Sequence, residues 1–106
     1  MVSIGTRQIR VMVKQHGDDD SDLQITTPVM PLPAGQRVAF LRRLLELNDP
    51  TIAGPAALFL EGDEVRFGVA RGLESLDQGE LEYLVTMVSL LPVQLEVTLR
   101  QDFDLR

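Results

Sequence analysis

Cysteine is absent from the sequence, which rules out a disulfide framework, thiol catalysis and thiolate metal sites. The single histidine, His16, has no nucleophile or second metal ligand at a recognisable spacing, so we expect an ordinary surface side chain. The glycines stand singly among turns, and no phosphate-binding loop of the Walker or dinucleotide type is present. These absences leave an enzyme, and a bound cofactor, without support from any residue.

Positive charge is scarce as well. The chain has 10 Lys and Arg against 16 Asp and Glu, a formal net charge of -6 and a pI of about 4.6, so a nucleic-acid backbone would be repelled. No apolar run approaches the ~20 residues of a membrane span, and the first residues do not resemble a signal peptide. We therefore expect a cytoplasmic protein that binds neither nucleic acid nor a membrane.

What the sequence does contain is the composition of one ordinary globular domain. Its 106 residues are 44% hydrophobic, enough for a real core, and the whole of residues 1–106 is expected to form a single domain. A chain of this length should bury somewhat over ~60% of the surface that it exposes when unfolded. Neither a metal ion nor a disulfide is needed for stability.

The clearest predicted element is a helix over Gln36–Leu47. At about 100° per residue its apolar residues gather on one side, and the helix is bounded by prolines before it and by Asn48, Asp49 and Pro50 after it. Asn48 tolerates the left-handed conformation that often closes a helix. The predicted core face consists of Val38, Leu41, Leu44 and Leu45, with Phe40 and Leu47 at its margin. So wide an apolar arc indicates a second apolar neighbour besides the sheet.

Two predicted hairpins flank this helix. Ile9–Lys14 and Leu23–Thr27 alternate as strands around a loop rich in Asp, and an extended connector with two prolines leads from them to the helix. Ala56–Glu61 and Glu64–Ala70 pair across Gly62 and Asp63, after a turn over Thr51–Pro55. The first strand of this second hairpin is apolar throughout and predicted to be central. The other should have a wet face formed by Glu64, Arg66 and Gly68, and the carboxylates near the turn are expected to be solvated.

A second helix is predicted over Leu76–Leu91. Asp77 can cap it, Glu80 completes a capping-box pattern, and Leu76 with Leu81 can form a hydrophobic staple. Residues 93–103 fit two patterns: strict alternation favours a strand, whereas the spacing of leucines through Phe103 favours a longer helix in which Pro92 is a kink or a new first turn. Periodicity alone does not decide between them.

Asp18, Asp20 and Asp22 stand at alternate positions, as the oxygen ligands of a calcium loop do. The glycine and terminal glutamate of an EF-hand do not follow, and we expect a solvated hairpin tip rather than a metal site. A small sensor domain that binds a metal ion or small ligand at this loop is the alternative to a protein-interaction domain.

Several segments together resemble the YbjN-like bacterial regulators and the related type III secretion chaperone-like domains. They are LLELN (Leu44–Asn48), ALFLEGDEVRFGV (Ala57–Val69) and GLESLDQGELEYLVTMV (Gly72–Val88), in the order hairpin, helix, hairpin, helix. The resemblance extends over about Arg7 to Val88 and concerns packing and turn motifs, with no catalytic residue among them.

The resemblance implies an α+β fold in ββαββα order, with helices on one face of an antiparallel sheet and a helical tail through Phe103. It implies no enzyme activity and commonly a homodimer that binds a protein or peptide client. Members of the family usually carry an additional N-terminal helix, for which Met1–Thr6 is too short. We therefore expect self-association to cover apolar surface, with Phe40, Leu44 and Leu47 as interface residues.

Overall fold

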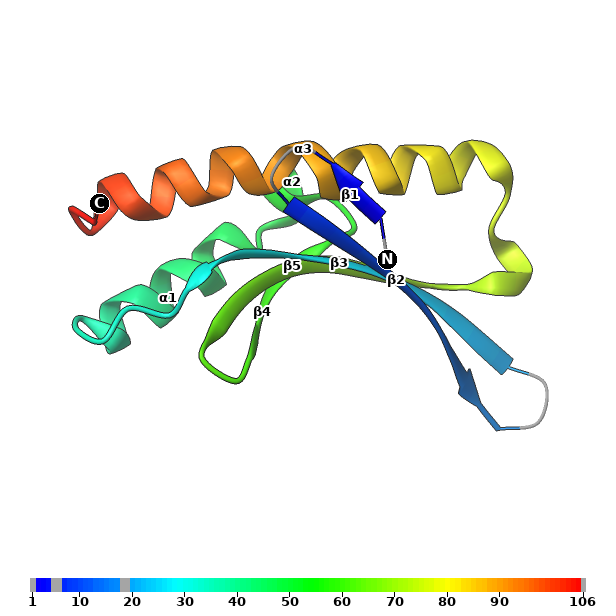
Figure 1. Ribbon diagram of the computed structural model, residues 1–106, viewed down its shortest axis with the longest axis horizontal. Helices are drawn as coiled ribbons and strands as arrows, with labels where there is room; N and C mark the ends of the chain where they lie inside the picture. Colours follow the sequence, from blue (N-terminus) through cyan, green and yellow to red (C-terminus); the bar gives the residue numbers. More distant parts are fainter. Residues whose placement is uncertain (1, 5–6, 18–19, 106) are drawn as a thin grey trace.

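The computed structural model describes residues 2–4, 7–17 and 20–105, which form a five-stranded antiparallel sheet with helices on one face (Figure 1). The elements in chain order are β1 (Val2–Ile4), β2 (Arg7–His16), β3 (Asp20–Pro31), α1 (Arg37–Leu47), α2 (Pro50–Ala53), β4 (Ala57–Glu61), β5 (Glu64–Gly72), a 3-10 turn η1 (Leu73–Ser75) and α3 (Gln78–Asp102). The predicted α+β class and the order of the two hairpins and two main helices are confirmed. Where a turn was predicted after α1, the chain instead forms the short helix α2, capped by the Asp49 side chain.

The strand order β1-β2-β3-β5-β4 makes β5 central and β4 an edge strand. Two predictions about the second hairpin are therefore wrong. β4 is not central, because only β5 pairs with it. The face of β5 that carries Arg66 and Gly68 is not solvent-exposed. Both residues are buried, because β5 lies between β3 and β4 in the sheet.

Helix α1 lies within the predicted bounds but is rotated about its axis relative to the prediction. Phe40 and Leu47, expected at the margin of the core face, are 0% and 3% exposed and belong to the core of the single chain, together with Leu44 at 5%, which was predicted on that face. Three residues of the predicted core face point outward instead: Val38, Leu41 and Leu45. The reason is the neighbouring helix: the Phe40 and Phe103 rings lie 5.2 Å apart between centroids. Asn48 closes α1 with a φ of -78°, so it does not use the left-handed conformation.

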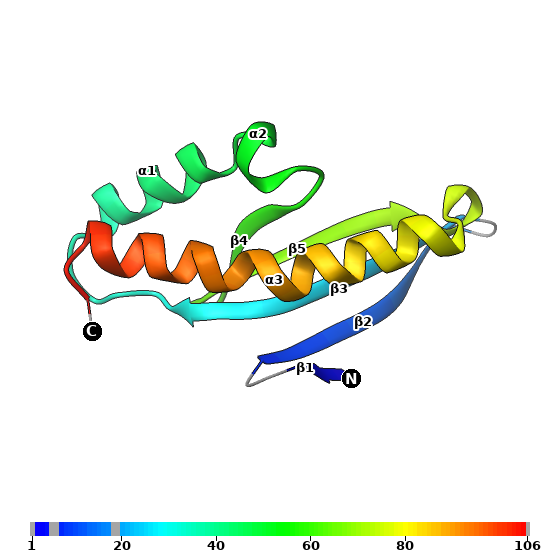
Figure 2. The same cartoon turned by 90° about the horizontal axis from the view of Figure 1, so that it is seen from above.

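Helix α3 starts as predicted, with the Asp77 side chain accepting a hydrogen bond from the Glu80 backbone N–H at 2.7 Å. It does not stop at Pro92 but continues to Asp102, which decides the tail in favour of a helix. By length and composition α3 would be long enough to cross a membrane. In this fold it lies along the sheet (Figures 1 and 2) and places one face in the core, through Leu84, Met87, Val88, Pro92, Leu95 and Leu99.

The two main helices lie side by side at the C-terminal end of α3 (Figure 2). Arg43 Nε donates a hydrogen bond to Asp102 Oδ2 at 2.8 Å, and the Gln36 side chain donates to the Phe103 carbonyl at 3.5 Å. These contacts turn the side of α1 that bears Phe40 toward the C-terminal end of α3.

Candidate interaction surfaces

Helix α1 exposes apolar side chains on the side that the core does not cover. We call Val38, Leu41 and Leu45 the α1 outer face; their side chains are 84%, 37% and 75% exposed. Their spacing of three and four residues puts them on one side of the helix. The chain thus builds α1 with two apolar faces and uses only one of them in its own core.

An apolar groove of about 270 Å³ adjoins this face. It lies between α1 and the edge strand, and its lining residues are Leu41, Leu44, Leu45, Asn48, Leu58, Phe59 and Leu60. Leu60 and Phe59 are themselves exposed, so the apolar surface continues from the helix onto β4. A continuous apolar surface of this kind is typical of a site that contacts another protein.

Asn48 occupies part of the open edge of β4. Its Nδ2 donates to the Leu58 carbonyl at 3.0 Å, and its Oδ1 accepts from the Leu58 N–H at 2.7 Å. The side-chain amide therefore satisfies the two backbone groups that a further strand would have bonded. Backbone groups alternate in direction along a strand, so those of Leu60 point toward the same outer edge.

The interface expected at Phe40, Leu44 and Leu47 is corrected by this geometry. Side chains that are nearly fully buried inside one chain offer no surface to a second copy. The apolar arc of α1 is wider than the core needs, as predicted, because Val38, Leu41 and Leu45 remain exposed. Helical periodicity shows the width of such an arc but not which half of it a neighbouring helix will cover.

The sheet face away from the helices is polar at its centre. Arg66 on β5 is only 8% exposed; its Nη1 donates to Glu64 Oε1 at 2.6 Å and its Nη2 to Thr26 Oγ1 at 3.2 Å. Arg10 on β2 donates to Glu61 Oε2 on β4 at 2.6 Å, across the two strands between them. This hydrogen bond lowers the pKa of the Glu61 carboxyl below its ordinary value, and the nearby charges of Arg10 and Arg66 act in the same direction.

Sequence reasoning did not find this cluster. The sequence pattern predicts Glu61 as a solvated residue near a turn, Arg66 as a residue on a solvent-exposed strand face, and Arg10 as one of the alternating residues of another strand. No local pattern joins β2 to β4, since two other strands separate them in the sheet. Only the strand order brings the three side chains together.

The Asp-rich loop gives no support to a metal site in the part of the chain described. Asp18 lies outside the described residues, whereas Asp20 and Asp22 are paired within β3 opposite His16 and Lys14 of β2. The His16 side chain also lies outside the described part. Among the residues that the structure does describe, no group of three His, Cys, Asp or Glu side chains could hold a metal ion.

Comparisons with known proteins found a matching family model and a solved structure of similar fold. The model of the family YbjN, described as "Putative bacterial sensory transduction regulator", matches residues 1–100. A structure entitled as the heterodimeric complex ExoU-SpcU from the type III secretion system of Pseudomonas aeruginosa contains a similar chain, with a TM-score of 0.60 and 14% identity. That match covers 81% of this chain and 79% of the other, and it confirms the predicted chaperone-like fold. No curated protein matches the sequence.

Proposed function

Because this chain belongs to the YbjN family, we propose that it is a non-enzymatic protein-interaction domain that pairs with a second copy through the α1 outer face. The observation that carries the proposal is the second apolar face of α1, which the chain's own core leaves uncovered. The similar chain was solved within a heterodimeric complex, which also favours a protein as the partner.

A second copy fits this surface for a physical reason. In a two-fold pair the same patch covers itself, so Val38, Leu41 and Leu45 of each copy would be removed from water together. Burying apolar area drives such contacts at roughly 25 cal/mol per Å². The adjoining groove along β4 then extends the contact, or receives a segment of a client protein beside the pair.

Light scattering over a concentration series tests the pairing. The wild type should reach the mass of a dimer, and Leu45→Glu should remain a folded monomer, because Leu45 lies outside the core and a charge there opposes apolar contact. Leu90→Glu is the matched control. Leu90 is an exposed leucine on the outer side of α3, so the same change there should leave the dimer intact.

Two results would overturn the proposal. One is a wild type that stays monomeric throughout the series. The other is a dimer that survives Leu45→Glu but dissociates in Leu90→Glu, which would move the interface to α3.

A further inference from the structure

The sheet face opposite the helices contains a hollowed region with charged and apolar parts. Two adjoining hollows of about 280 and 230 Å³ share Gln24, Thr26 and Phe59. A third, of about 190 Å³, lies toward Pro28. The Arg10 and Glu61 side chains, which meet across β3 and β5, line the second hollow, and Arg10 also lines the third.

Hydrogen-bond donors exceed acceptors in this region. Two guanidinium groups carry ten N–H bonds. Within the described residues, Arg10 and Arg66 donate three side-chain hydrogen bonds, to Glu61, Glu64 and Thr26. The Nε atoms of both arginines are buried and donate no hydrogen bond there, although Arg66 Nε lies 3.5 Å from Glu61 Oε2. Buried donors without partners are costly, so this is a place where an added acceptor would stabilise the protein.

Glu61 shows what kind of acceptor the two arginines bind. Its Oε2 atom lies 2.6 Å from Arg10 Nη2 and 3.5 Å from Arg66 Nε, so one carboxylate oxygen is placed between two guanidinium groups. The Glu61 side chain is 53% exposed and stands at the end of a hairpin strand. The Arg10–Glu61 pair is partly exposed, with 33% and 53% of the two side chains open to solvent, and such pairs contribute little to stability.

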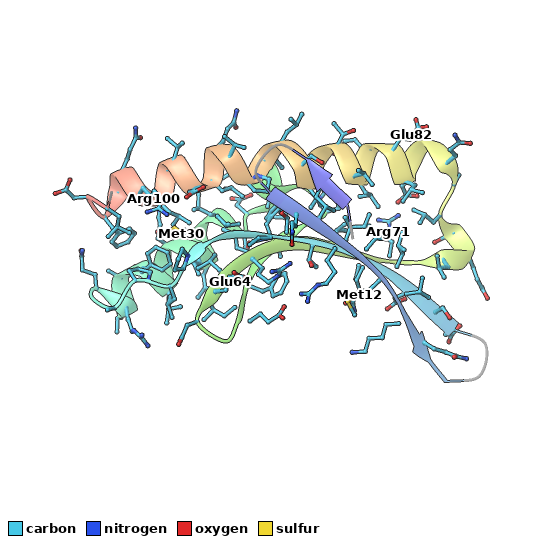
Figure 3. All side chains as sticks on the ribbon, in the orientation of Figure 1. Met12, Met30, Glu64, Arg71, Glu82 and Arg100 are labelled. Atoms are coloured by element: carbon cyan, nitrogen blue, oxygen red, sulfur yellow. The ribbon has the colours of Figure 1, made fainter. Side chains whose placement is uncertain are left out.

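The second hollow has apolar side chains in its lining as well as Arg10 and Glu61. Met12 from β2 and Phe59 from β4 line it, and both side chains are partly open to solvent. Figure 3 shows Met12 on the side of the sheet away from α3. The adjoining hollow has Gly68 and Ala70 of β5 in its lining. Apolar walls with a few convergent polar groups are typical of small-molecule sites.

We propose that this hollow binds a small organic carboxylate, and that Glu61 occupies the place of the ligand's carboxylate when no ligand is bound. On binding, the ligand's carboxylate accepts hydrogen bonds from Arg10 and Arg66 while its apolar part enters between Met12 and Phe59. Glu61 turns into solvent. The charges then balance, because two guanidinium groups face Glu64 and the ligand. This site goes beyond the proposed pairing and does not depend on it.

Titration with 3-phenylpropionate, followed by 1H–15N NMR, tests the site. We expect shifts in the backbone amides of Thr26, Gly68 and Ala70, and none along α1. Glu61→Gln should tighten binding by roughly tenfold, because a neutral amide competes less well for the arginines. Arg10→Gln should weaken it by about the same factor. Arg37→Gln, an arginine exposed on α1, is the control that should change nothing.

Two further probes separate the parts of the site. Acetate carries only the charged group and 3-phenylpropanol only the apolar part, so each should bind more weakly than 3-phenylpropionate. Phe59→Ala should weaken binding of 3-phenylpropionate and leave acetate unaffected.

Three outcomes would overturn this proposal. They are unchanged or weaker binding in Glu61→Gln, equal binding of the alcohol and the acid, and tighter binding of a tetrapeptide ending in phenylalanine, which would make a chain end the ligand. Light scattering of Glu61→Gln keeps the two proposals apart, because the mass of the protein should not change whether or not the carboxylate binds.

Discussion

At the residue scale, Asn48 substitutes for a missing strand. Its side-chain amide bonds both backbone groups of Leu58 on the edge of β4. Asn48→Ala should therefore lower the free energy of unfolding by about 1–3 kcal/mol, the usual cost of leaving part-buried polar groups unpaired. Urea denaturation measures this change in the free energy of unfolding. Asn48→Asp keeps the acceptor for the Leu58 N–H but puts a carboxylate oxygen against the Leu58 carbonyl oxygen, so its loss should be at least as large as that of Asn48→Ala. An Asn48→Ala variant as stable as the wild type would contradict this role.

Gly68 has to be a glycine because the neighbouring strand β3 lies too close to it for a side chain. A Cβ atom there would lie 2.6 Å from the Ile25 carbonyl oxygen and 2.6 Å from Thr26 Cγ2, both on the neighbouring strand β3. Gly68→Ala should cost about 1–3 kcal/mol of stability, because β3 must shift and strain its pairing with β5. Gly35→Ala, where nothing lies within 4 Å, is the matched control and should stay within about 0.5 kcal/mol of the wild type. Equal melting curves for the two variants would show that β3 adapts freely.

At the scale of the element, α1 shows what a helical pattern leaves open. The boundaries of the helix and the surplus of apolar residues could both be predicted, because they depend on prolines and on local spacing. Which side of α1 faces inward could not be predicted from the sequence. It depends on Phe103 and Asp102 at the far end of the chain, which contact Phe40 and Arg43.

The C-terminal half of α3 allows a direct test of helix against strand. In a strand Val97 and Leu99 would share a face, whereas in α3 Leu99 is 0% exposed and Val97 is 49% exposed. Leu99→Ala should cost about 2–5 kcal/mol through the cavity that it leaves, and Val97→Ala should cost under about 0.5 kcal/mol. Chemical denaturation of both variants measures the difference. Similar losses in the two would favour the strand.

At the scale of the whole molecule, the sequence predicts pairs of neighbouring elements better than the arrangement of the sheet. Both hairpins, the Asp77 cap and the order of elements follow from local turn and capping chemistry. The position of β4 at the edge did not follow, because its exposed apolar residues, Phe59 and Leu60, line the groove beside α1 and give the strand the apolar composition of a central one. The meeting of Arg10 with Glu61 likewise requires the full strand order.

The pairing of two copies through α1 is the central claim, and cross-linking through a single introduced thiol tests it most directly. The sequence has no cysteine, so Arg42→Cys, exposed on α1, would carry the only thiol. Two paired α1 helices would lie roughly 8–10 Å apart, within reach of a short bismaleimide. The account predicts covalent dimers of Arg42→Cys that disappear when Leu45→Glu is added, and few dimers of Lys14→Cys on the distant hairpin. Equal yields at positions 42 and 14, or none at 42, would contradict it.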